Sequence, residues 1–196
     1  MDFLLWDYRQ LIKIFKFFGD EKYSKKIVRK IIEIRKKKII NTEDLTKIIN
    51  SIKRFKNSKI NNSTKVFQAL RIFVNKEISE LINGLINAFY LLPTGGVIAV
   101  VTFHSLEDKI VKFFFRNYSE IKNPSRYVPN KDNNIRCFKL QNNKPITPNL
   151  KEQKINPPSR SAKLRFATKI SNESNFEEFR QKFKYLIDIE NLQFNK

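Results

Sequence analysis

The sequence contains a single cysteine, Cys137, and a single histidine, His104, among its 196 residues. A chain with one cysteine cannot form an internal disulfide, so we expect an intracellular protein. One cysteine and one histidine are also too few for the nitrogen and sulfur ligand sets that zinc prefers. We therefore expect no metal site in this chain.

Long hydrophobic runs are missing as well. The longest, Val97 to Phe103, is far shorter than the roughly 20 residues that a membrane-spanning helix needs. Asp2, Asp7 and Arg9 interrupt the apolar N-terminus, and no small-residue cleavage site follows, so the sequence lacks a secretory signal. These absences predict a soluble, cytoplasmic protein with no membrane partner.

Acidic residues are few: 19 Asp and Glu stand against 39 Lys and Arg, which gives a net charge of +20. Such an excess indicates an anionic partner, and RNA fits an intracellular protein best. The alternative is compositional, since an AT-rich genome would by itself produce many Lys, Asn, Ile and Phe residues. The sequence leaves both explanations open.

The N-terminal part of the chain has a helical pattern. Between Met1 and Asn57, apolar residues recur at spacings of three and four, which predicts three helices separated by short breaks at Gly19 and before Thr42. Their basic face either contacts RNA or is simply solvated. From Thr64 to about Leu92 we expect one long helix. Its apolar stripe would be Phe67, Leu70, Val74, Ile78, Leu81, Leu85 and Phe89.

A βα unit follows at residues 94–118. Gly95 and Gly96 form a turn, and the apolar run Val97 to Phe103 is typical of a strand buried on both faces of a parallel sheet. A polar cluster and an amphipathic helix come next. In open α/β sheets, ligands bind at the carboxyl ends of the strands, so this cluster is the first candidate site.

The remaining third is less regular. Residues 119–158 lose periodicity, which predicts a long surface loop with a short strand at Ile135 to Leu140. Ser161 to Ile170 alternates apolar and charged residues, as in a half-exposed antiparallel strand. Phe176 to Phe194 predicts a peripheral helix.

Four segments together resemble one known family. They are STKVFQALRIFVNKEI at 63–78, TGGVIAVVTFHSLEDKIVKFFF at 94–115, KPITP at 144–148 and NPPSRSAKLRFATK at 156–169. Their order and spacing are similar to those of the bacterial small-subunit rRNA cytosine-N4 methyltransferases, the RsmH/MraW family. FGDEKYSKKIVRKI at 18–31 resembles the helical insertion of that family.

The resemblance implies an α/β fold, namely the C-terminal part of a class I (Rossmann-like) methyltransferase sheet preceded by a small helical insertion domain. Residues 1–62 would be part of the substrate-recognition insert, 63–170 the C-terminal half of the methyltransferase domain, and 171–196 a peripheral C-terminal helix. The family uses S-adenosyl-L-methionine to methylate a cytidine in the decoding centre of 16S rRNA in the small ribosomal subunit.

The cofactor motifs of that family lie upstream of the matched region. None of the four glycines forms the glycine-rich strand-to-helix turn that cradles a cofactor. We therefore expect no cofactor-binding residue in this chain, a missing N-terminal half as partner, and no activity of the chain alone.

The polar cluster supplies the candidate catalytic residues His104, Ser105, Glu107 and Asp108. Methyl transfer to a cytosine amine needs an extruded base and a group that accepts a proton or hydrogen bond. The structural alternative is a capping box between Ser105 and Asp108, with Glu107 stabilising the helix N-terminus.

Candidate RNA-binding residues lie in two further places. Phe67, Gln68, Arg71 and Asn75 share a helix face, where they could stack on a base, read a base edge or hold a phosphate. The alternative is that Phe67 belongs to the core and that Arg71 pairs with a carboxylate. Arg160 and Lys163 either contact the RNA backbone or form a solvated strand face.

Two other function classes stay open. A non-catalytic RNA-binding or ribosome-assembly protein derived from the same scaffold would explain the charge without chemistry. A basic membrane-surface protein would rest only on amphipathic basic helices.

Overall fold

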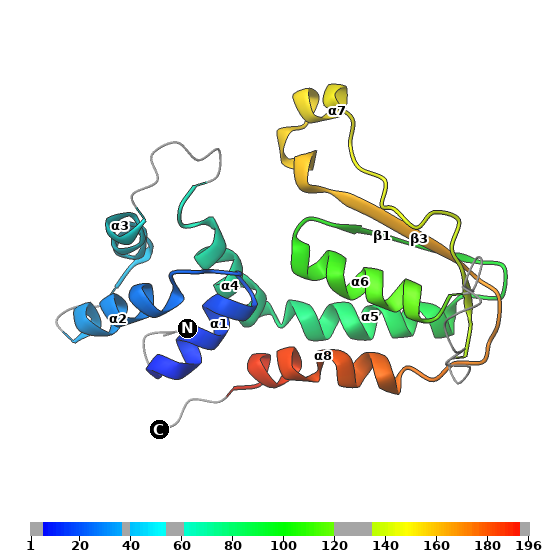
Figure 1. The fold of residues 1–196 in the computed structure, drawn as a ribbon, viewed down its shortest axis with the longest axis horizontal. Helices are drawn as coiled ribbons and strands as arrows, with labels where there is room; N and C mark the ends of the chain where they lie inside the picture. The colour runs from blue at the N-terminus through cyan, green and yellow to red at the C-terminus, as the bar shows by residue number, and fades with distance from the viewer. Residues whose placement is uncertain (1–5, 37–39, 54–60, 120–134, 193–196) are drawn as a thin grey trace, which may run out of the picture. The chain divides into compact units, whose positions relative to one another are not determined.

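The computed structural model describes residues 6–36, 40–53, 61–119 and 135–192 (Figure 1). The chain divides into two compact units, residues 1–79 with 185–196 and residues 80–184. The division falls inside the two helices α5 (Glu77–Leu91) and α8 (Glu177–Glu190). Over the described residues, no helix is long and apolar enough to cross a bilayer.

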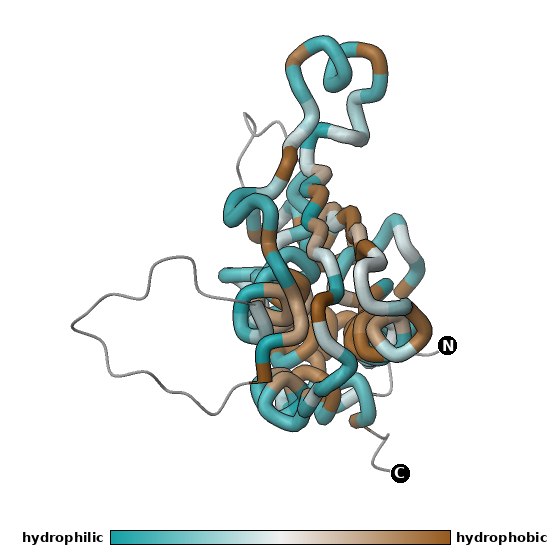
Figure 2. The backbone as a smooth tube through the Cα atoms, turned by 90° about the vertical axis from the view of Figure 1, so that its right-hand side faces the viewer, coloured by the Kyte–Doolittle hydropathy of each residue, from teal (hydrophilic) through white to brown (hydrophobic). Residues whose placement is uncertain are grey.

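The first unit is helical, as its sequence pattern predicts. Its helices are α1 (Tyr8–Phe17), α2 (Ser24–Arg35), α3 (Thr42–Ile52) and α4 (Thr64–Asn75). Helix α1 packs against α2 and α4, and α2 packs against α3. Along the backbone tube of Figure 2, hydrophobic and hydrophilic stretches follow one another closely, as in a chain of amphipathic elements. Capping boxes start α1 at Asp7 and α3 at Asn41.

Gly19 allows a close approach within this unit. A Cβ at this position would lie 2.3 Å from the backbone oxygen of Lys65, and 3.1 Å from Cβ of Ala69. Side chains larger than hydrogen are therefore excluded where the end of α1 meets α4. The helix stop predicted at Gly19 is confirmed, and packing accounts for the residue type.

The long helix expected from Thr64 to Leu92 is wrong, because the chain breaks into α4 and α5. Lys76 between them has a left-handed backbone with φ 52°. Glu190 stabilises the break: its carboxylate accepts hydrogen bonds from the backbone N–H of Ile78 at 2.8 Å and of Ser79 at 2.9 Å. This buried side chain caps the N-terminus of α5.

The break also changes which face of α4 is buried. Val74, expected in the apolar stripe, is 45% exposed. The buried side chains of α4 are Val66, Ala69, Ile72 and Phe73, and three of them directly precede the expected Phe67, Leu70 and Val74.

The sheet of the second unit differs from the parallel sheet that we expected. Strand β1 (Val97–Thr102) forms where predicted, but it pairs antiparallel with β3 (Lys163–Lys169), which pairs in turn with β2 (Phe138–Lys139). The order β1-β3-β2 places β1 at an edge. Within the described residues it has neither a second strand neighbour nor two covered faces, so the prediction of an interior parallel strand is wrong for this chain.

Helix α6 (Ser105–Asn117) covers one face of this sheet by packing on β1 and β3 (Figure 1). The opposite face is apolar and partly open. Val97 and Val101 on it are each 52% exposed. Their partners across the ladder are Thr168 and Leu164.

An aromatic core joins the helices of the second unit. Phe114 of α6 lies 5.3 Å from Phe138 and 4.9 Å from Phe179, between ring centroids. Phe179 and Phe183 of α8 are fully buried. The C-terminal helix is therefore part of the core, and the expectation of a peripheral helix is wrong.

The region expected to be a loop contains two short helices among its described residues, α7 (Leu150–Ile155) and the 3-10 helix η2 (Pro157–Ser161). The short strand expected at Ile135 to Leu140 is confirmed as β2. Residues 120–134 of that loop lie outside the described part of the chain.

Charged side chains of β3 point toward the helices, not toward solvent. Arg165 Nε donates to Asp108 Oδ1 at 2.7 Å, and Lys163 Nζ donates to Asp108 Oδ2 at 3.0 Å. Burial acts to raise the pKa of Asp108, but these two cations outweigh it and hold the pKa below its ordinary value. Lys169 Nζ donates to the carbonyl oxygens of Phe89 and Leu92, at 2.9 and 2.7 Å, at the end of α5.

Two glycine substitutions should have opposite effects on stability. Gly19→Ala should lower the free energy of unfolding by about 1–3 kcal/mol, because the new methyl group meets backbone. Gly84→Ala in α5 should raise it by about 0.5–1 kcal/mol, since nothing lies within 4 Å of the added Cβ and alanine favours the helix. Urea unfolding measures both. Equal effects of the two substitutions would contradict the packing described for Gly19.

Asp108→Asn should destabilise the chain at neutral pH by about 2 kcal/mol, because Arg165 loses its charged partner. A lowered folded-state pKa contributes stability above the ordinary value of 3.8, and this contribution disappears as the pH falls below it. The difference between wild type and variant should therefore shrink below about pH 4 in acid titrations of thermal stability.

The matched control is Lys163→Met. Its effect should be smaller, since Lys163 is 39% exposed and Arg165 still pairs with Asp108. A difference between wild type and Asp108→Asn that does not change with pH would exclude the ion pair as its source.

Candidate functional site

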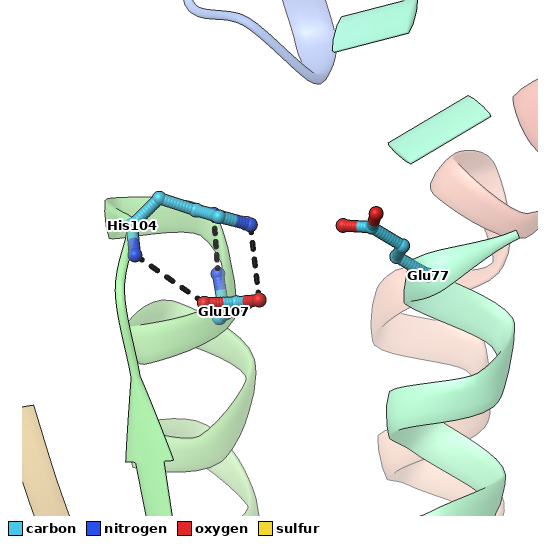
Figure 3. A group of neighbouring side chains, drawn as sticks. All are labelled: Glu77, His104 and Glu107. Carbon is cyan, nitrogen blue, oxygen red and sulfur yellow. Dashed lines mark hydrogen bonds and ion pairs between the residues drawn. The ribbon is translucent and has the colours of Figure 1, made fainter. Parts of the chain in front are cut away.

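The polar cluster predicted from the sequence lies at the carboxyl end of β1, where the strand turns into α6. His104 is the N-cap residue of the helix, with extended backbone angles. Its Nδ1 accepts a hydrogen bond from the backbone N–H of Glu107 at 3.3 Å, and Glu107 Oε2 accepts from the backbone N–H of His104 at 3.3 Å. Figure 3 shows these reciprocal bonds, which form a capping box.

The capping box expected between Ser105 and Asp108 is therefore wrong by one residue. Ser105 is the first residue of the helix and is exposed. Asp108 faces β3, where Arg165 and Lys163 bind both of its oxygens. The four predicted residues thus separate into a close pair, His104 and Glu107, an exposed serine and a carboxylate engaged by the sheet.

His104 and Glu107 also meet through their side chains. Nε2 of His104 lies 3.1 Å from Oε1 of Glu107 (Figure 3). Because Nδ1 accepts the backbone N–H, the proton of a neutral ring is on Nε2, the ring nitrogen that lies beside the carboxylate. This Nε2 is buried, and its contact with Oε1 is too poorly aligned to count as a hydrogen bond. The side chain of His104 is 10% exposed and that of Glu107 is 23% exposed.

Glu107 is an ionised acceptor in this arrangement. Burial acts to raise the pKa of Glu107, but the nearby His104 side chain and the backbone N–H groups of Phe103 and His104 outweigh it and lower the pKa below its ordinary value. The Phe103 N–H lies 2.8 Å from Oε2. A carboxylate has about four lone-pair positions, so it can accept one more donor from a ligand. Amino groups of cytosine are donors of this kind.

Phe103 is an exposed neighbour of this pair that sequence reasoning missed. It ends the apolar run and was expected to be buried with it, but its side chain is 56% exposed beside His104. An exposed aromatic ring next to an ionised acceptor is suited to stack on a base. Its position at the end of an edge strand was the missing information, and the sequence carried no signal for it.

The second predicted group lies on α4 in the first unit. Arg71 donates from Nε and a terminal nitrogen to both oxygens of Glu77, at 2.8 and 3.0 Å. Asn75 also donates to Glu77, at 3.1 Å, and Gln68 donates to the backbone oxygen of Phe18 at 3.2 Å. Phe67 is half-buried. Arg71 therefore has the carboxylate partner that the structural alternative proposed, although the arginine side chain stays 56% exposed.

The third predicted pair consists of Arg160, which is exposed on η2, and Lys163, which is bound to Asp108. Arg165 of the same strand is 10% exposed and binds the same carboxylate. Of these cations, Arg160 is the most accessible.

The geometry of this chain does not fit a cofactor cradle. All four glycines lie in the described part: Gly19 in a turn between helices, Gly84 inside α5, and Gly95 and Gly96 before β1. None follows a strand and opens a helix, where close backbone approach to a ligand would need it. The one described strand that leads into a long helix has His104 and Glu107 at the turn.

Three similar proteins carry the same name, ribosomal RNA small subunit methyltransferase H. The protein of Ehrlichia canis is 46% identical over 163 residues, which are 82% of this chain and 52% of that protein. That of Persephonella marina is 41% identical over 164 residues, 82% of this chain and 51% of that protein. That of Streptococcus mutans is 42% identical over 172 residues, 85% and 54% respectively. The chain spans about half the length of the curated relatives that it matches.

A sequence model of one protein family, described as the MraW methylase family, matches residues 4–170. The match includes the His104–Glu107 turn, both helices α4 and α5, and strands β1 and β3. It covers most of the chain and agrees with the relatives named above. The chain therefore belongs to the MraW methylase family of methyltransferases.

Proposed function

We propose that this chain takes part in the S-adenosylmethionine-dependent N4-methylation of a cytidine in the decoding centre of 16S rRNA, in the cytoplasm, and that it supplies about half of the length of such an enzyme. The observation that carries the proposal is the pairing of His104 with an ionised Glu107 at the carboxyl end of β1, in a chain of a methyltransferase family. Residues 1–62 would belong to the substrate-recognition insert, 63–170 to the methyltransferase domain, and 171–196 to a C-terminal extension.

In this proposal, Glu107 accepts a hydrogen bond from the exocyclic amine of the flipped cytosine. That contact fixes the amine nitrogen relative to the methyl donor and stabilises the positive charge that develops on the nitrogen as it gains the methyl group, a charge that is lost when the nitrogen releases one of its two protons. His104 holds the carboxylate in place through its ring and backbone. Phe103 offers an exposed ring for stacking on the base.

The methyl donor, S-adenosyl-L-methionine, supplies the methyl group when it is bound. The residues of this chain do not fit its binding, as the positions of the glycines indicate. We assign that binding to the half of the relatives' length that this chain does not span. The open apolar face of the sheet, with Val97 and Val101, is the surface we assign to that half.

Two groups are assigned to RNA. Arg160 and Lys163 would contact phosphates near the sheet, while Phe67, Gln68, Arg71 and Asn75 on α4 would contact the substrate from the helical unit. The bidentate bond of Arg71 to Glu77 makes this arginine a rigid donor that keeps an exposed edge.

Complementation tests the proposal directly. The isolated chain should neither bind S-adenosylmethionine nor methylate small ribosomal subunits. Adding the part of the Ehrlichia canis relative that this chain does not span should restore both, as measured by calorimetry and by mass spectrometry of the cytidine. The double variant Val97→Glu/Val101→Glu should prevent this, because charges on the open face cannot be buried.

The matched control is Leu150→Glu/Ile155→Glu on α7, whose side chains are 76% and 77% exposed and lie outside the strand face. It should complement like wild type. If the mixture stays inactive although it retains RNA on filters, the non-catalytic RNA-binding alternative replaces the proposal. Micromolar binding of the cofactor by the isolated chain would contradict the assignment of the cofactor site.

Glu107→Gln should lower kcat of the complemented enzyme about 100-fold with little change in KM for RNA, because it removes the charge beside the reacting amine. Glutamine keeps the capping box, so the helix should still fold. Glu80→Gln on α5, an exposed carboxylate of the same unit, is the control and should retain full activity. Wild-type kcat in Glu107→Gln would remove Glu107 from the proposed chemistry.

A further inference from the structure

Basic and aromatic side chains of α6 and α8 line an open groove in the second unit. The groove has a volume of about 360 Å³. We call it the α6/α8 groove, and its main lining residues are Lys109, Lys112, Phe113, Arg116, Lys182 and Phe183. The family model matches residues 4–170, so α8, one of the two walls of the groove, lies outside the residues that this model matches.

The cations of this groove are free to bind an anion. Lys109, Lys112 and Arg116 are spaced by three and four residues, so they follow one face of α6 over roughly 10 Å. These three and Lys182 are exposed, and none of them forms an ion pair with a carboxylate of the described residues. One carboxylate, Glu178, lies at the end of the groove, where it accepts a hydrogen bond from Asn117 at 3.0 Å.

The floor of the groove is aromatic and rigid. Phe113 is half-buried and packs edge-on against Phe183, with centroids 5.5 Å apart, and parallel to Phe179 at 6.2 Å. Phe183 is 1% exposed, so it cannot move without disturbing the core. Lys182 Nζ lies 5.7 Å from the centroid of Phe113. The ring of Phe113 is thus accessible to a ligand between the cations of the groove.

We propose that the α6/α8 groove binds single-stranded RNA, with its cations on successive phosphates and Phe113 against a base. Cations that track a backbone, together with a ring for stacking, are the combination that binds single strands without sequence preference. A lipid surface fits less well, because Phe113 is half-buried and the exposed side chains around it are cations. The choice of ribosomal RNA as the natural strand rests on the proposed function, whereas the groove itself does not.

The test removes two cations. Lys109→Gln/Lys112→Gln should weaken binding of a short fluorescent single-stranded RNA about ten-fold at low salt. The slope of log affinity against log salt should become shallower by about 1.4, at about 0.7 for each lost phosphate contact. Lys151→Gln/Lys154→Gln on α7 loses the same charge at exposed positions and should bind like wild type. Circular dichroism verifies that both variants are folded.

A third variant separates stacking from charge. Phe113→Leu keeps the apolar packing and should weaken binding several-fold with an unchanged salt slope. Equal losses of RNA affinity in the α6 and α7 double variants would show that only net charge matters and would overturn the proposal. A wild-type chain that does not bind RNA would also overturn it. Loss of binding to phosphatidylserine vesicles with RNA binding intact would assign the groove to lipid instead.

These measurements need no methyl donor and no second polypeptide. RNA binding that depends on the groove, in a chain that does not methylate even when it is complemented, would support the groove and contradict the proposed function. Methylation by a complemented enzyme whose affinity for RNA does not change in the groove variants would support the proposed function and contradict the groove proposal.

Discussion

Two basic side chains of β3, Arg165 and Lys169, tie the sheet of the second unit to the helices beside it. Arg165 binds Asp108 in α6, and Lys169 binds the last carbonyl oxygens of α5. Both are almost completely buried, so each depends on its partner to offset the loss of hydration. Because residues alternate along a strand, the same arrangement turns the apolar side chains of β3 to the other face. On β3, the face that the helices cover therefore carries the charged side chains, and the open face carries the apolar ones. In a usual amphipathic strand the apolar face is the covered one.

The chemistry assigned to this chain follows from that constraint. Asp108 holds the first turn of α6 against β3, which fixes where the helix begins. Glu107 is one residue earlier and points about 100° away around the helix, toward His104. Adjacent carboxylates therefore have separate roles, one joined to two cations and one left with a free lone pair. Folding of the turn and assembly of the polar pair are a single event, since the capping bonds are also the bonds that orient Glu107.

The sequence was sufficient where a local pattern determines the structure. Helices α1, α2 and α3, strand β1 and the polar turn after it all have periodicity or a run of their own, and they form where predicted. The sequence was insufficient where a residue far away along the chain determines the local structure. No glycine or proline marks the break at Lys76, which is stabilised by Glu190, 112 residues from Ile78 in the sequence. The apolar run of β1 predicted a strand buried on both faces, but β1 lies at an edge of the sheet and Val97 and Val101 are half exposed, because pairing partners and not the run itself determine burial.

The net charge, like the local sequence pattern, does not show which residues end up in contact. A net charge of +20 counts every cation equally, but position separates them into different classes. Arg165 and Lys169 are consumed inside the fold by a carboxylate and by carbonyl oxygens, and Lys53 is buried against Glu21. Lys109, Lys112 and Arg116 remain exposed beside an aromatic ring with no ion-pair partner among the described residues. Only cations of the second class can release counterions when a polyanion binds, so the arrangement of charge, and not its sum, supports an RNA surface on this chain.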